Sequence, residues 1–167
     1  TPFCRPCEYR SMSALIVRPL HGRIEVRGLR GPREGEPANK QMFKTAAGAA
    51  IRPTWVVPPG LPRWEGYWTI SRNHLSVVAE AIAIRDGEVT IEMHYSEHER
   101  CDSRWQGSTG DDCTCSCEGI HHGEAQHAAW KQVGDTTLVR SAGEKVVTRR
   151  LTAKRARKER DARKRRV

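Results

Sequence analysis

The chain has 167 residues, of which 37% are hydrophobic and 6% aromatic, and it carries a net charge of +9. This length suits one ordinary domain with a modest core. The sequence contains no run of 18 or more apolar residues and no N-terminal apolar region. We therefore expect neither a membrane span nor a signal peptide.

The first third of the chain predicts a β-hairpin, a helix and an extended segment. Residues 13–18 and 23–28 are β-branched or alternating runs separated by Pro and Gly, which is typical of a hairpin. A Gly/Pro-rich loop follows, and Asn39 is then a candidate N-cap for a short helix that ends near Gly48. Four prolines exclude a helix in residues 51–62, so this segment should be extended.

The middle of the chain predicts the core of the sheet. Residues 67–71 have the composition of a strand, and Asp86-Gly87 is a type I′ turn signal between residues 77–84 and 88–95. In the register set by a two-residue turn, seven of the eight residues on one face are apolar. A helix over residues 75–84 is the alternative, because this segment is rich in alanine. The continuous register favours the hairpin.

A cysteine-rich stretch, residues 101–123, follows this predicted hairpin. Such closely spaced thiols among Gly, Ser, Thr and Asp cannot build an apolar core and need a cross-link to hold a shape. Because no export signal is visible, bound metal or reduced thiols are favoured over disulfides. The pattern C-x11-C-x-C-x-C-x4-H predicts structural zinc, and the candidate ligands are Cys101, Cys113, Cys115, Cys117 and either His121 or His122.

These five candidates exceed the four ligands that structural zinc usually takes. One cysteine is therefore spare, bridges to a second metal, or joins Cys4 and Cys7 in another site. The Cys4-x-x-Cys7 pair is itself a candidate zinc half-site, with a redox dithiol or two unrelated cysteines as alternatives. His94 and His98 precede the stretch and are weaker candidates, because histidines at a strand end are usually only solvated.

The stretch resembles a cysteine-rich knuckle, roughly C-x3-C-x7-C-x-C-x-C-x-G-x-N-H-G, of uncharacterised small proteins from bacteriophages and actinobacteria. Trp105 stands where that pattern has its second cysteine, and His121 stands where it has Asn. The resemblance implies a phage or actinobacterial origin and a structural zinc, but no established activity. The positions that match are Cys101, Cys113, Cys115, Cys117, Gly119, His122 and Gly123.

After the knuckle, the composition predicts a helix over residues 124–133 and a strand over residues 136–140. Residues 149–167 then hold eleven Lys or Arg against two acidic residues, whereas the rest of the chain is neutral overall. The composition of this arm favours helix, but its charges surround the whole helical wheel. We therefore expect an arm that does not dock as a core helix and lacks the apolar face of an interfacial membrane helix.

Such a run is either a solvated tail or a contact surface for a polyanion, most commonly nucleic acid. The predicted contacts are mainly to phosphates and carry little sequence readout. The candidate nucleic-acid-binding residues are Arg149, Arg150, Lys154, Arg155, Arg157, Lys158, Arg160, Arg163, Lys164, Arg165 and Arg166.

Taken together, the sequence predicts an α+β fold with a small antiparallel sheet, one domain over residues 1–148 and a basic arm over residues 149–167. No phosphate-binding loop, H-E-x-x-H motif or nucleophile elbow is present. The leading hypothesis is a zinc-stapled, non-catalytic protein that binds DNA, RNA or a nucleoprotein complex. It would act in the cytoplasm of a bacterial or phage-infected cell, or in a virion.

Two alternatives remain open. The first is a phage structural or adaptor protein whose arm contacts packaged genome or an acidic phage or host protein. The second is a metal-dependent nuclease or hydrolase, in which His121-His122 lies beside an open zinc position that activates water.

Overall fold

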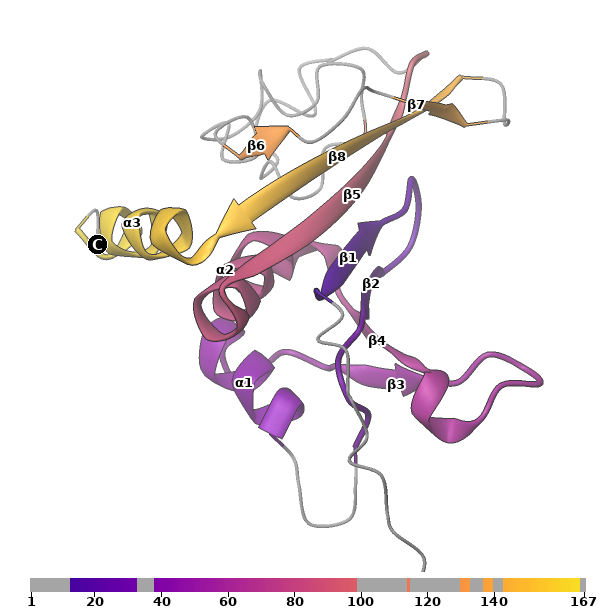
Figure 1. Cartoon of the computed structure of the whole chain (residues 1–167), viewed down its shortest axis with the longest axis horizontal. Coiled ribbons are helices and arrows are strands. Elements are labelled where there is room, and N and C mark those ends of the chain that lie inside the picture. The colour runs from indigo at the N-terminus through magenta and orange to yellow at the C-terminus, as the bar shows by residue number, and fades with distance from the viewer. Residues whose placement is uncertain are drawn as a thin grey trace, which may run out of the picture.

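The computed structural model describes residues 13–32, 38–98, 114, 130–132, 137–139 and 143–165 (Figure 1). In these residues a mixed eight-stranded sheet carries three α-helices, which confirms an α+β fold. None of the described helices has the length and apolar content needed to cross a bilayer. In chain order the elements are β1 (Leu15–Arg18), β2 (Ile24–Arg27), α1 (Ala38–Ala47), β3 (Thr54–Val56), η1 (Arg63–Glu65), β4 (Tyr67–Ile70), η2 (Arg72–His74), α2 (Leu75–Asp86), β5 (Glu88–Ser96), β6 (Lys131–Gln132), β7 (Thr137–Val139), β8 (Glu144–Thr152) and α3 (Ala153–Lys164).

The sheet has the strand order β3-β4-β2-β1-β5-β8-β6, and β7 also pairs with β8. Its longest ladder joins β5 to β8, from Glu88 opposite Thr152 to Ser96 opposite Glu144. The β1 and β5 strands are parallel, with Ile16 opposite Ile91, whereas the other pairs are antiparallel. The expected antiparallel sheet is therefore a mixed one. A parallel arrangement needs a crossover, and α2 provides it between β4 and β5.

The three helices pack together, and α2 lies between α1 and α3 (Figure 1). The α2 helix also packs on β5 and β8. One cluster of buried side chains joins all three helices to the sheet, including Phe43 of α1, Ile82 of α2 and Ile91 of β5. The alternating strand residues, such as Ile24 and Val26, contribute their buried face to this core, as their spacing predicted.

The predicted hairpin around Asp86-Gly87 is wrong, because residues 77–84 belong to α2. The apolar positions of this segment satisfy both periods, but the helix buries them at spacings of three and four residues: Leu75, Val78, Ala79, Ile82 and Ala83. Its alanines also favour helix. The second half of the predicted hairpin is confirmed as β5, whose partners are β1 and β8.

Most of the other expected elements are confirmed. The β1–β2 hairpin and the β4 and β7 strands lie where the sequence predicted them, and β3 lies within the segment that was expected to be extended. The α1 helix ends before Gly48, but Asn39 lies inside its first turn and donates a side-chain hydrogen bond to the Arg30 carbonyl at 2.7 Å. The predicted helix over residues 124–133 is wrong at its end, where Lys131–Gln132 pairs with β8 as β6.

Gly87 ends α2 in a conformation that other residues rarely adopt. Its φ is 97°, and its N–H donates to the Ala83 carbonyl at 2.9 Å. Its own carbonyl accepts from the Ala153 N–H at 2.7 Å, which links the end of α2 to the start of α3.

We expect Gly87→Ala to lower the free energy of unfolding by about 1–3 kcal/mol, because a Cβ strains the backbone at this φ even where space is open. Urea unfolding measures this change. Glu97→Ala, at an exposed position after β5, is the control and should change stability by less than about 0.5 kcal/mol. Equal stability of the two variants would contradict the described backbone.

Candidate nucleic-acid interface

The basic arm is docked, contrary to the expectation that its charges would keep it off the core. Ala156 of α3 is fully buried in the same cluster as the apolar residues of α2. A methyl group is small enough to let two helices approach closely, and the aliphatic stems of neighbouring Lys and Arg can cover the remaining apolar surface. The buried methyl group of Ala156 therefore places α3 on the core although its helical wheel lacks an apolar stripe.

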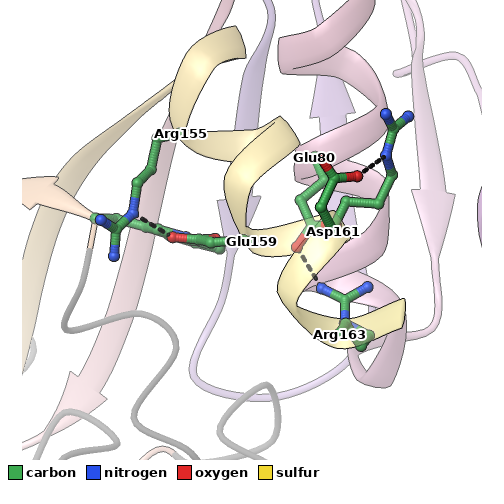
Figure 2. A network of polar contacts seen from close by, with 7 residues as sticks. Glu80, Arg155, Glu159, Asp161 and Arg163 are labelled. Carbon is green, nitrogen blue, oxygen red and sulfur yellow. Dashed lines mark hydrogen bonds and ion pairs between the residues drawn. The ribbon is translucent and has the colours of Figure 1, made fainter. Parts of the chain in front are cut away.

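A polar contact fixes α3 further along the same side. Arg163, seven residues after Ala156, forms an ion pair with Glu80 of α2 (Figure 2). The Glu80 side chain is only 5% exposed, whereas that of Arg163 is 37% exposed. A buried carboxylate is costly unless it is paired, so this contact selects the position of α3 on α2.

Glu159 connects α3 to two other groups. Its carboxylate accepts from the Arg155 guanidinium at 2.7 Å within the helix, as Figure 2 shows. It also accepts from the indole N–H of Trp130 at 3.1 Å, and Trp130 is buried. Glu80 of α2 and Glu159 of α3 thus each pair with an arginine of α3, while the side chains of these arginines, Arg155 and Arg163, stay 42% and 37% exposed.

The first basic residues of the arm belong to the sheet. Arg149 lies in β8 opposite Ile91 and is 5% exposed, so it does not present a charge to a ligand in this structure. Arg150 points to the exposed side, 3.9 Å from the Glu88 carboxylate. Arg166 lies outside the described residues.

The opposite side of α3 presents a basic face, which we define as Lys154, Arg157, Lys158 and Arg165. All four residues are exposed, and Asp161 is the acidic residue among them. From Lys154 to Arg165 the helix rises about 16 Å. Duplex DNA carries one charge for about every 1.7 Å of its axis, so a row of this length faces several phosphates.

Arg160 and Lys164 point along the side of α3 instead, where they border a groove between the three helices. The groove has a volume of about 730 Å³ and an apolar floor that includes Met42, Val77 and Ile84. Arg85 completes its basic rim and is held by Asp86 and by the Asn39 side chain. The described arm residues therefore lie in four settings: in the sheet, in ion pairs with Glu80 and Glu159, beside the groove and on the exposed face.

All the predicted metal ligands lie outside the described residues: Cys4, Cys7, Cys101, Cys113, Cys115, Cys117, His121 and His122. Thr114, inside the C-x-C-x-C pattern, is described and buried. Its carbonyl accepts from the Ser96 N–H at 2.7 Å, at the end of β5. Within the described ranges, no group of three or more His, Cys, Asp or Glu is placed to hold a metal.

Of the two weaker histidine candidates, His94 has a clear pairing. Its Nδ1 lies 2.5 Å from Glu144 Oε1, across the β5–β8 ladder. Arg18 lies nearby in β1, fully buried, and donates to the His94 carbonyl while its guanidinium stands 4.5 Å from the centre of the Tyr95 ring. The burial of Arg18 could not be predicted from the sequence, since an arginine at a strand end normally reaches solvent.

We expect Arg163→Ala to lower the free energy of unfolding by about 1–3 kcal/mol, because it removes the guanidinium that pairs with a buried carboxylate. Lys164→Ala removes a neighbouring exposed charge and should change stability by less than about 0.5 kcal/mol. Urea unfolding of both variants checks this difference. If Arg163→Ala is no less stable than Lys164→Ala, the ion pair does not fix α3.

Comparison of the chain with protein-family models, with curated proteins and with solved structures found no match.

Proposed function

We propose that this protein binds nucleic acid through the basic face of α3, without catalysis. The observation that supports this proposal is that α3 is docked on α2 while Lys154, Arg157, Lys158 and Arg165 remain exposed together. A fixed helix has already lost the backbone entropy that a free tail would lose on binding. Its cations are thus presented as a preformed row.

The expected contacts are ion pairs with phosphates. Lysines supply point charges, and the two arginines can bind phosphate oxygens through two N–H groups. The basic face carries no Asn or Gln that could pair with adenine. Affinity should therefore depend strongly on salt and weakly on sequence, with DNA and RNA both candidate ligands.

The pair Lys154 and Lys158 allows a closely matched test. Both lysines are exposed and lie four residues apart on α3, and Lys40 and Lys44 have the same spacing and exposure on α1. The double variants Lys154→Gln/Lys158→Gln and Lys40→Gln/Lys44→Gln hence remove the same charge from equivalent positions on two helices.

We expect Lys154→Gln/Lys158→Gln to weaken duplex binding about tenfold or more at 0.1 M salt. It should also flatten the slope of log K against log[salt] by about 1.8, since each phosphate contact contributes about 0.9. Fluorescence anisotropy with a labelled duplex at several salt concentrations measures both effects. If Lys40→Gln/Lys44→Gln weakened binding equally, binding would depend only on the net charge of the protein. That result would contradict binding through the basic face of α3.

Point variants are preferable to removing the arm. Deleting residues 154–167 would also remove Ala156 from the core and the guanidinium that pairs with Glu80. Loss of binding in such a truncation would not separate contact from folding.

A second candidate is an adaptor function in which the groove between the helices takes an acidic protein segment. Its apolar floor and its rim of Arg85, Arg160 and Lys164 favour an amphipathic helix with acidic flanks. Titration with an acidic helical peptide separates the two functions. For the adaptor function, Arg160→Gln/Lys164→Gln should weaken binding of this peptide, whereas Lys154→Gln/Lys158→Gln should not.

We further propose that structural zinc cross-links the cysteine-rich stretch. The support is chemical: the stretch combines thiols and imidazoles with almost no apolar residues, and zinc accepts both donor types. The residues that would hold it are drawn from Cys101, Cys113, Cys115, Cys117 and His122, with Cys4 and Cys7 as additional donors.

Native mass spectrometry with a thiol count checks this proposal. We expect the protein to carry zinc with its six cysteines reduced, and a chelator to remove the metal and lower the melting temperature. A protein with three disulfides and no metal would contradict it.

A further inference from the structure

Two neighbouring tryptophans hold two loops in place at the β3–β4 edge of the sheet. Trp55 and Trp68 are cross-strand partners whose ring centres lie 5.4 Å apart, and Trp68 also packs edge-on against Phe43 in the core. The Trp68 indole N–H donates to the Arg30 carbonyl at 3.0 Å, and the Trp55 indole N–H donates to the Arg63 carbonyl at 3.1 Å. Each indole therefore anchors one loop.

Two glycines bring both loops onto the same ring. A Cβ at Gly31 would lie 2.5 Å from the Trp55 ring, and a Cβ at Gly66 would lie 2.6 Å from it. Glycine is required where a backbone comes this close to a ring. Because both loops pack on Trp55 and also accept a hydrogen bond from an indole, the space between them is preformed.

That space is a groove of about 830 Å³ between residues 27–32 and 58–67. Trp64 and Leu61 lie on it and are 77% and 45% exposed, the exposed large hydrophobic residues of the described chain. Among the described residues, its charged lining residues are Arg27, Arg30, Arg63 and Glu65, three basic against one acidic. An exposed indole in a cationic groove is the arrangement that stacks unpaired bases in single-strand-binding proteins.

We propose that this groove binds an unpaired nucleotide, with the base stacked on Trp64 and the adjoining phosphates contacting Arg30 and Arg63. Arg27 has another role, because it pairs with Glu25 and stands over the Tyr67 ring at 5.4 Å. The charge excess is what favours a nucleotide over a proline-rich peptide, which an aromatic groove alone would also accept.

This inference rests on the proposed nucleic-acid function and adds a single-stranded ligand to it. The two surfaces are separate: α3 lies at one end of the molecule in Figure 1, and the loop between β3 and β4 lies at the other. Each can therefore be changed without touching the other.

The test titrates the full-length protein with a short oligothymidylate and with an abasic oligomer of the same length and charge. We expect Trp64→Ala to weaken oligothymidylate binding about 5- to 150-fold, which corresponds to one stacked base. Trp64→Phe should restore most of the affinity because it keeps a π-face. Wild-type tryptophan fluorescence should be quenched by oligothymidylate, and Trp64→Ala should lose most of that quenching.

The abasic oligomer should bind weakly and equally to wild type and Trp64→Ala, since it offers phosphates without bases. Circular dichroism controls for folding, which the exposed position of Trp64 should leave unchanged. Trp64→Ala should keep its affinity for a blunt duplex, whereas Lys154→Gln/Lys158→Gln should not.

Three outcomes would overturn the inference. These are unchanged oligothymidylate binding in Trp64→Ala, a Trp64-dependent complex with a proline-rich peptide in place of the oligonucleotide, and a Trp64-dependent dimer in sedimentation. Failure of the proposed function gives a different result: Lys154→Gln/Lys158→Gln would leave the affinity for duplex unchanged, independently of the result with Trp64→Ala.

Discussion

The docking of α3 on α2 is the contact on which the candidate interface depends. It combines a buried methyl group at Ala156 with an ion pair between Arg163 and the nearly buried Glu80. The alanine permits close approach, and the carboxylate penalises any rotation of α3 that would separate it from the guanidinium. Together they decide which cations of a charge-dense helix face inward and which face solvent. The basic face is thus a product of packing rather than of charge alone.

The helical layer also explains why the sheet is mixed. The α2 helix connects β4 to β5 over the strands between them, so β5 lies parallel to β1 and pairs on its other edge with the long β8. Because β8 leads directly into α3, the β5–β8 ladder fixes where α3 begins. The hydrogen bond from the Ala153 N–H to the Gly87 carbonyl connects that point to the end of α2. The start of the basic helix and the end of the crossover helix are therefore held together.

Local pattern predicted the elements whose periodicity was unambiguous. Alternation identified β2, and turn residues identified its hairpin with β1, because one face of those strands is buried and the other is partly exposed. Periodicity did not identify the structure of residues 77–84, where nearly every position is apolar or alanine, so that the helical and the strand period both fit. The sequence also did not predict the docking of α3, because its apolar contact is a single residue, Ala156. The remaining contact is an ion pair with another helix, which a helical wheel does not show. Neither Glu80 nor Arg163 signals its partner 83 residues away in the sequence.

The two candidate ligand surfaces differ in how their cations are held, and under the proposed function they would contact different parts of a nucleic acid. On α3 the cations stand in a row on a fixed helix without an exposed aromatic ring, which suits a regular series of phosphates. At the β3–β4 edge, two indole hydrogen bonds and two closely packed glycines fix an exposed indole among arginines, which suits one base and its phosphates. A ligand with a paired and an unpaired part, such as a duplex end with an overhang, presents both features. Simultaneous contact would raise affinity through effective concentration, provided that the overhang spans the sheet between the two surfaces.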